Sequence, residues 1–77
     1  MNQKLEVYYD TEADILEITI GKYTSCVFDE VADDVFEAHD EKTNELKGYK
    51  ILNFLKRGGM KNIRLALPAN VILEAHN

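Results

Sequence analysis

Strict alternation of apolar and polar side chains along two N-terminal stretches limits this part of the chain to β structure. Successive side chains of a strand point to opposite faces of a sheet, so a period of two residues predicts strands buried on one face. We therefore predict strands over residues 5–10 and 15–20, joined as a β-hairpin by a loop of about four residues. The apolar residues on the predicted buried face are Leu5, Val7, Tyr9, Leu16, Ile18 and Ile20.

The same period recurs further along the chain. Residues 35–39 and 46–52 predict a second hairpin, connected by a polar turn in which Asn44 best tolerates left-handed backbone geometry. Gly48, inside the second of these strands, predicts a bulge or the close approach of another backbone. Residues 63–67 alternate once more and predict a fifth strand, which Pro68 ends.

The remaining segments have no clean period. Residues 22–34 predict an extended connection with a short strand or turn, and residues 71–73 predict a strand or a helical turn. Asn53 predicts the N-cap of a single helical turn over 54–57, which glycines 58 and 59 end. The fold we predict is mainly β, with a β-rich α+β fold as the alternative. It is a single antiparallel sheet of two hairpins plus a fifth strand, with at most a short helical turn.

The size of the chain sets how that sheet can be covered. With 77 residues, 45% of them hydrophobic, the chain supports one modest core, and we expect a single domain over residues 1–77. Little helix is available, so the sheet must curl on itself, pack beneath the C-terminal segment or meet a second copy. Because a single core stabilises so small a domain only weakly, we expect a homodimer.

Three absences indicate the compartment. The sequence has no apolar run long enough to span a membrane, and residues 1–5 do not begin a signal peptide. Cys26 is the single cysteine and cannot form an internal disulfide, which favours a reducing environment. We therefore expect a soluble cytoplasmic protein that has no membrane partner.

Acidic and basic residues are separated along the sequence. Residues 1–45 carry thirteen acidic and three basic side chains, a net charge of −10, and residues 46–77 carry one acidic and six basic, a net charge of +5. Either acidic and basic strands lie side by side in one sheet, or a basic face binds nucleic acid or an acidic protein. The candidate partner-binding residues of such a face are Lys56, Arg57, Lys61 and Arg64.

Few side chains are spaced for catalysis or metal binding. Asp10 and Asp14 flank the first predicted turn and could bind a hard cation, but aspartates there also accept backbone N–H groups as turn residues. His39, His76 and Cys26 lack the spacing of a zinc site, and no sequence pattern identifies a histidine that activates the thiol. We expect no catalytic residue, no cofactor, no metal and no enzymatic activity.

Residues 9–18, Tyr-Asp-Thr-Glu-Ala-Asp-Ile-Leu-Glu-Ile, resemble the Y-D-x-x-x-D-x-L-x-I signature of a small bacterial and archaeal protein family of unknown function. The second predicted hairpin is similar to that of the family, except that Lys50 stands where an acid is customary. The resemblance covers residues 5–54 and implies a small strand-rich fold with no established activity. Some members look as if they accompany small toxin-like proteins, which implies an antitoxin-like role.

These observations lead to one expected function and one alternative. We expect a protein–protein association module that either associates with itself or is the acidic partner of a small toxin-like protein. The alternative is a small nucleic-acid-binding protein that uses the basic C-terminal third. It is less favoured because the basic cluster carries four charges and has few aromatic side chains for base stacking.

Overall fold

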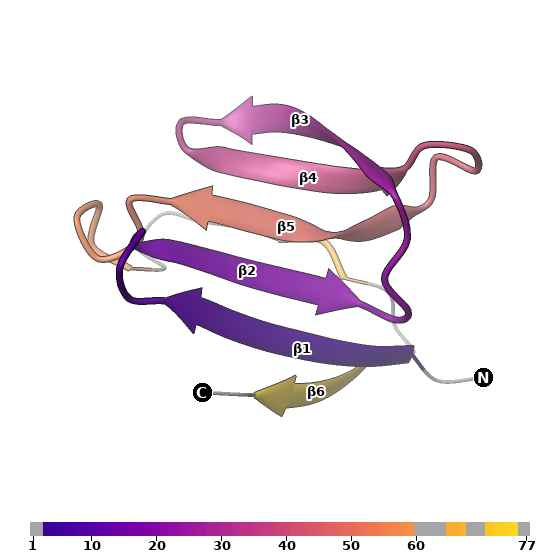
Figure 1. The fold of residues 1–77 in the computed structure, drawn as a ribbon, viewed down its shortest axis with the longest axis horizontal. Helices are drawn as coiled ribbons and strands as arrows, with labels where there is room; N and C mark the ends of the chain where they lie inside the picture. The colour runs from indigo at the N-terminus through magenta and orange to yellow at the C-terminus, as the bar shows by residue number, and fades with distance from the viewer. Residues whose placement is uncertain (1–2, 60–64, 68–70, 76–77) are drawn as a thin grey trace.

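A computed structural model describes residues 3–59 and 65–67 of the chain and the backbone of residues 71–75. Its strands are β1 (Gln3–Asp10), β2 (Ile15–Ile20), β3 (Cys26–Ala32), β4 (Val35–Asp40), β5 (Leu46–Leu52) and β6 (Val71–Ala75). They form one sheet in the order β3-β4-β5-β2-β1-β6, shown in Figure 1. The strands β1 to β5 pair antiparallel, and β6 joins the outer edge of β1 in parallel. The described residues include no helix that could cross a membrane.

Both predicted hairpins are confirmed. In the first, β1 pairs with β2 so that Leu5 lies opposite Ile20 and Tyr9 opposite Leu16, which brings the alternating apolar residues onto one face. In the second, β4 pairs with β5, and β5 also pairs with β2. The prediction of a single antiparallel sheet of two hairpins plus a fifth strand is therefore confirmed.

The fifth antiparallel strand, however, is not at residues 63–67. It is β3, which lies within the segment for which we predicted an extended connection with a short strand or turn. Residues 65–67 form no strand, and residues 63–64 lie outside the described part of the chain. The alternation there was misleading because Leu65 is half-buried against the core and makes no strand pairing. Of the two possibilities predicted for residues 71–73, the strand is the one observed.

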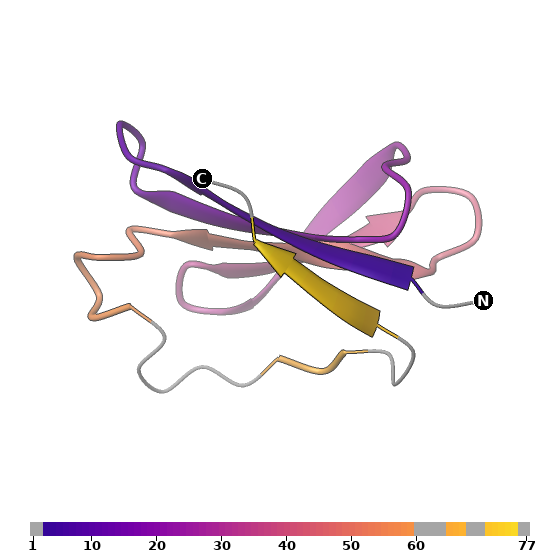
Figure 2. The ribbon, with the colours of Figure 1, turned by 90° about the horizontal axis from the view of Figure 1, so that it is seen from below.

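One face of the sheet holds the hydrophobic core, and the chain after β5 packs on it. Phe54 and Leu65 contact the core, and the Tyr49 phenol donates a 2.6 Å hydrogen bond to the Ala66 carbonyl. Figure 2 shows the described parts of this returning chain lying beneath the sheet. The sequence allowed three ways to cover the sheet, and the one observed in this chain is packing beneath the C-terminal segment. The buried core residues are Leu5, Leu16, Ile18, Ile20, Val35, Tyr49 and Ile51.

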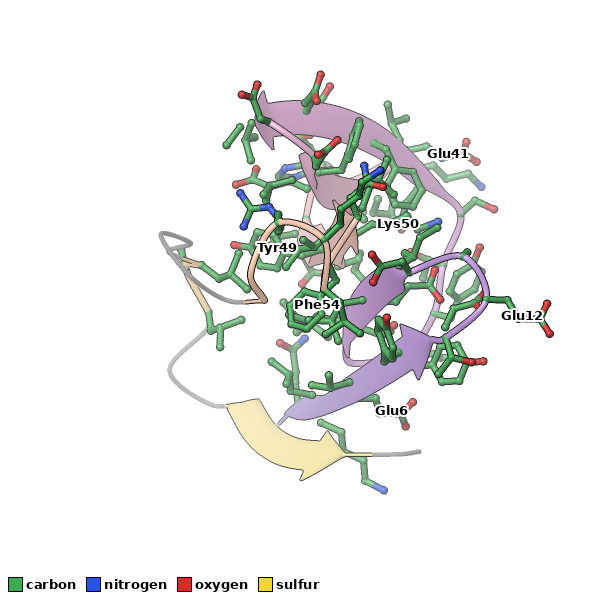
Figure 3. All side chains as sticks on the ribbon, turned by 90° about the vertical axis from the view of Figure 1, so that its left-hand side faces the viewer. Glu6, Glu12, Glu41, Tyr49, Lys50 and Phe54 are labelled. Atoms are coloured by element: carbon green, nitrogen blue, oxygen red, sulfur yellow. The ribbon has the colours of Figure 1, made fainter. Side chains whose placement is uncertain are left out.

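The opposite face, here called the open face, is not covered by any element of the described chain. Tyr49 and Lys50 are neighbours in β5, and alternation directs their side chains to opposite sides of the sheet. In Figure 3, Tyr49 and Phe54 lie on the side of the core and Lys50 lies on the open face. Phe36 shares the open face, because it pairs with Lys50 across β4 and β5.

The strand β5 approaches β2 so closely at Gly48 that no side chain fits there. A Cβ atom at this position would overlap the carbonyl oxygen of Ile18, and the φ angle of +157° is one that other residues rarely adopt. The pairing of β4 with β5 also shifts register here and leaves Lys47 without a partner in β4. Both features predicted from this glycine, a bulge and a close backbone approach, are present.

Candidate functional site

The two hairpins end their first strands with the same kind of turn. In the first hairpin the Asp10 carboxylate accepts the backbone N–H groups of residues 12 and 13, at 3.0 and 3.1 Å. In the second, the Asp40 carboxylate accepts those of residues 42 and 43, at 2.8 and 2.9 Å, and these bonds help lower its pKa to about 2. Asp14 and Asn44 then adopt positive φ angles of 58° and 63°. Asp10 is therefore a turn residue, and Asn44 has the left-handed geometry that was predicted.

Asp14 connects the first hairpin to the chain after β5. Its carboxylate accepts the Tyr9 hydroxyl at 2.6 Å and the backbone N–H groups of Leu55 and Lys56 at 2.9 and 3.3 Å. The bond to Tyr9 is the main cause of the lowered pKa of Asp14, and it raises the pKa of Tyr9 to about 12. Tyr9, Asp10 and Asp14, the residues of the Y-D-x-x-x-D pattern, thus stabilise the first turn and its contact with the chain after β5.

Asn53 is not the N-cap that we predicted. Its φ angle is 53°, and its side-chain amide donates a 3.4 Å hydrogen bond to Asp34. The backbone N–H groups of the following turn are accepted by Asp14 instead, from a hairpin distant in sequence. The turn closes through a 2.8 Å bond from the Gly59 N–H to the Phe54 carbonyl. This places the Phe54 ring 5.8 Å from that of Tyr9, over the core.

His39 is held between two acceptors. One imidazole nitrogen lies 2.9 Å from a Glu37 carboxylate oxygen, and the other lies 3.2 Å from the Asn44 carbonyl. The bond to Glu37 is the main cause of the raised pKa of His39, and the charge of Asp29 adds to it. Among the described residues no group of three His, Cys, Asp or Glu side chains could hold a metal ion. His76 lies outside those residues.

The predicted basic cluster is only partly described. Lys56 is exposed and Arg57 half-buried in the turn after β5, whereas Lys61 and Arg64 lie outside the described residues. Within the sheet, opposite charges do pair between strands: Lys50 Nζ lies 3.3 Å from a Glu17 carboxylate oxygen. This ion pair agrees with the first explanation for the separated charges, in which acidic and basic strands lie side by side in one sheet.

The acidic surface of the β3–β4 hairpin was not singled out from the sequence. Residues 23–41 contain seven acidic side chains and no lysine or arginine, so the hairpin has a strongly negative charge. Asp29 lies directly opposite Glu37, a pairing of like charges that is unfavourable within one sheet. The seven acidic residues are Asp29, Glu30, Asp33, Asp34, Glu37, Asp40 and Glu41.

The same hairpin contains β3, one of the two edge strands of the sheet. The strand β3 is last in the strand order, and no described strand pairs with its outer edge. Residues 27–32 are all exposed, including Val27 at 53%, Phe28 at 48% and Val31 at 53%. Exposure on both faces also explains why the sequence of β3 shows no alternation. The only sequence signal for this site was an apolar segment among acidic residues.

A small hollow of about 60 Å³ lies on the open face beside β3. Its lining includes the small residues Thr19, Ala38 and Gly48, together with the side chains of Phe28 and Lys50. The Lys50 ammonium lies 4.9 Å from the centre of the Phe28 ring. Because the three small residues occupy adjacent positions on paired strands, they leave a depression between larger neighbours.

Comparison with known proteins finds no match to this chain, whether among family models, curated proteins or solved structures. The resemblance to the Y-D-x-x-x-D-x-L-x-I family therefore stays a prediction. The function is accordingly inferred from the geometry of the β3–β4 hairpin.

Proposed function

We propose that this chain is a protein–protein association module, which binds an extended basic segment of another protein along the outer edge of β3. The observation that supports this most strongly is an exposed edge strand, bearing three exposed apolar side chains, within a hairpin that has seven acidic residues and no lysine or arginine. A module of this kind acts by binding, so the proposal requires no catalytic residue.

The backbone of β3 supplies the binding energy that is independent of sequence. An edge strand presents a row of N–H and C=O groups that an incoming strand can pair with, and many peptide-binding domains use this mode. Exposed apolar side chains on both faces of β3, such as Val27 and Phe28, add area to be buried when the segment binds.

Charge complementarity selects the partner. Lysine or arginine side chains on the incoming strand would lie opposite Asp29 and Glu30 and form cross-strand ion pairs. A second copy of β3 fits less well, because a symmetric antiparallel pairing centred on the strand sets Asp29 opposite Asp29 of the second copy. The basic partner agrees with the acidic, antitoxin-like role that the sequence resemblance implies.

The homodimer expected from the sequence stays a separate prediction. The apolar face of the first hairpin, which a second copy could have covered, lies in the core of one chain, since Leu16 and Ile18 are buried there. Sedimentation equilibrium at micromolar concentration tests it, and the mass of a single chain at both low and high salt would contradict it.

We also propose a compartment and keep one alternative function. We place the association in the cytoplasm, because Cys26 is a free thiol and the resemblance is to bacterial and archaeal proteins. Nucleic-acid binding through the basic C-terminal third is the alternative. A single-stranded oligonucleotide titrated against the chain tests it, and binding would shift the amides of Lys56 and Arg57.

The proposal is tested with a short peptide of alternating lysine and valine, about as long as β3. Added to the isotope-labelled chain, it should shift the amide resonances of residues 26–32 and slow their exchange with solvent. A peptide of alternating glutamate and valine should do neither. Equal binding of both peptides, or shifts confined to residues other than 26–32, would show that the proposal is wrong.

Matched variants distinguish binding at the edge strand β3 from general electrostatic attraction of a basic peptide to an acidic protein. The variant Asp29→Asn with Glu30→Gln should bind the lysine peptide about threefold more weakly, since the lysines of an alternating peptide share one face and so meet one of the two acids, in an ion pair of about 0.7 kcal/mol. The control variant Glu6→Gln with Glu12→Gln loses the same charge from exposed positions of the first hairpin, visible in Figure 3, and should bind almost as the natural chain does.

A further inference from the structure

We infer that the proton on His39 regulates the binding of the basic segment at β3, which should bind more tightly when the imidazole is neutral. This inference rests on the proposed function, because it concerns the same segment at the same edge of the sheet. It adds a dependence on pH near neutrality to an edge that selects its partner by charge.

The basic side chains of the segment should lie on the face of β3 that carries Asp29. This residue lies directly opposite Glu37, so two carboxylates share one face of the sheet. On the other face, Glu30 shares β3 with Phe28, whose ring centre lies 4.9 Å from the Lys50 ammonium. That ammonium repels a second positive charge, so the face with the two carboxylates is the favoured one.

His39 lies on the same face as these two carboxylates, two residues along β4 from Glu37. The residues that pair with it are apolar, Val27 in β3 and Leu46 in β5. Within the described residues, the charged groups that act on it are the Glu37 carboxylate, 2.9 Å from one ring nitrogen, and Asp29 on β3. A charge on the imidazole therefore acts on both carboxylates.

The hydrogen bonds of His39 favour the protonated ring. One ring nitrogen lies 2.9 Å from a Glu37 carboxylate oxygen, and the other lies 3.2 Å from the Asn44 carbonyl. Both partners are acceptors, and only the imidazolium has an N–H on each nitrogen. This geometry agrees with the raised pKa of His39. The side chain is 22% exposed, so the ring can exchange its proton with solvent.

The proton on His39 and the basic segment compete for the same carboxylates. With the proton in place, the imidazolium is paired with Glu37 and repels a lysine placed beside Asp29. Without it, Asp29 and Glu37 face each other as like charges, a pairing that is unfavourable until a positive charge is added. A lysine of the bound segment supplies that charge. Binding and protonation therefore oppose each other, and by linkage each weakens the other by the same factor.

The affinity of the lysine–valine peptide is the first measurement. At low salt, where charges are least screened, it should be about threefold higher at about pH 8 than at about pH 5.5, the effect expected of one cross-strand charge contact. The variant His39→Gln lacks the titrating ring and should bind almost equally at both pH values. The control variant His76→Gln lacks the other histidine of the chain and should keep the difference.

The titration of His39 in the natural chain is the second measurement, and it does not depend on the folding of a variant. Followed by NMR of the assigned imidazole signals, the pKa of His39 should fall when the lysine–valine peptide is bound at saturation. By linkage, the two ionisation constants should differ by the same threefold factor as the affinities. The glutamate–valine peptide at the same concentration should leave the titration unchanged.

The outcomes separate this inference from the proposed function. If the lysine–valine peptide shifts the β3 amides but binds equally at both pH values, or leaves the titration of His39 unchanged, this inference is wrong while the proposed function stands. A pH dependence that persists in His39→Gln, or disappears in His76→Gln, also contradicts it. If the peptide shifts no β3 amide at either pH, both proposals are wrong.

Discussion

The carboxylate of Asp14 joins parts of the chain that lie 41 positions apart in the sequence. We predict that Asp14→Asn lowers the melting temperature, because an amide accepts fewer hydrogen bonds than a carboxylate that now accepts three. Without that charge, the Tyr9 phenol should titrate nearer its ordinary pKa of 10 than the present value of about 12. Thermal melts and the ultraviolet absorbance of tyrosinate measure the two effects. Asp33→Asn, an exposed acid in the β3–β4 turn, should change neither.

The lowered pKa of Asp14 also predicts how acid changes the stability of the fold. Because its pKa in the folded chain lies below the ordinary value of 3.8, Asp14 contributes stability that is fully present above that value. The contribution is lost as the pH falls through the folded pKa. We predict that Asp14→Asn loses less stability than the natural chain as the pH falls, because it lacks the carboxyl that becomes protonated. Acid titration followed by circular dichroism measures the difference.

His39 should act in the opposite direction near neutral pH. Its pKa is raised above 6.5, so the stability from its contact with Glu37 is fully present below that pH and lost as the pH rises through the folded pKa. We predict that His39→Gln reduces the difference in unfolding free energy between about pH 5.5 and about pH 8. Urea denaturation at the two pH values measures it. An unchanged difference would contradict the prediction, since His76 is retained.

Residues whose role is local could be read from the sequence, and those with distant partners could not. The turn roles of Asp10 and Asn44 depend on their immediate neighbours in the chain, so residue type and position were sufficient. Asn53 was assigned the cap of the following turn because the sequence does not show that Asp14 reaches the same N–H groups.

At the scale of the strands, Gly48 fixes how β2 and β5 lie together. We predict that Gly48→Ala prevents stable folding, because the added methyl overlaps the Ile18 backbone, which cannot move without breaking the sheet. Gly59→Ala is the control: it also has a positive φ, but its Cβ atom would meet only the edge of the Phe54 ring at 3.8 Å. That variant should lose about 1 kcal/mol of unfolding free energy in urea denaturation, from backbone strain alone.

The strands that the sequence revealed are those buried on one face. The strands β1, β2, β4 and β5 border the core, and burial of one face is what produces alternation. The strand β3 is exposed on both faces and so lacks that pattern, and a bulge near Val31 interrupts the period further. Conversely, Leu65 and Leu67 alternate without forming a strand, because one of them packs on the core from outside the sheet.

At the scale of the whole molecule, the core depends on the chain after β5. We predict that Phe54→Ala lowers the unfolding free energy by about 2 kcal/mol, because the half-buried ring covers the core and packs on Tyr9. Leu55→Ala changes the adjacent residue, which is 66% exposed, and should have almost no effect. Chemical denaturation compares the two. Equal losses would mean that this turn does not cover the core.

The candidate site at β3 depends on the structure, and the basic residues predicted as partner-binding stay a prediction. The separated charges led us to the basic residues from Lys56 to Arg64, whereas the exposed, strongly charged edge belongs to the acidic hairpin. A sum of charges along the sequence cannot tell which charges are already paired, as Lys50 is with Glu17. It also cannot tell which strand has a free edge, since that depends on the order of strands in the sheet.

The parallel pairing of β6 with β1 brings together the two ends of the sequence. Residues 3–7 lie beside residues 71–75, so this contact has almost the largest sequence separation that the chain allows. Contacts of such separation are costly in chain entropy and form late, and during synthesis β6 is made after the other five strands. The edge of β1 must therefore remain open until β6 has been synthesised.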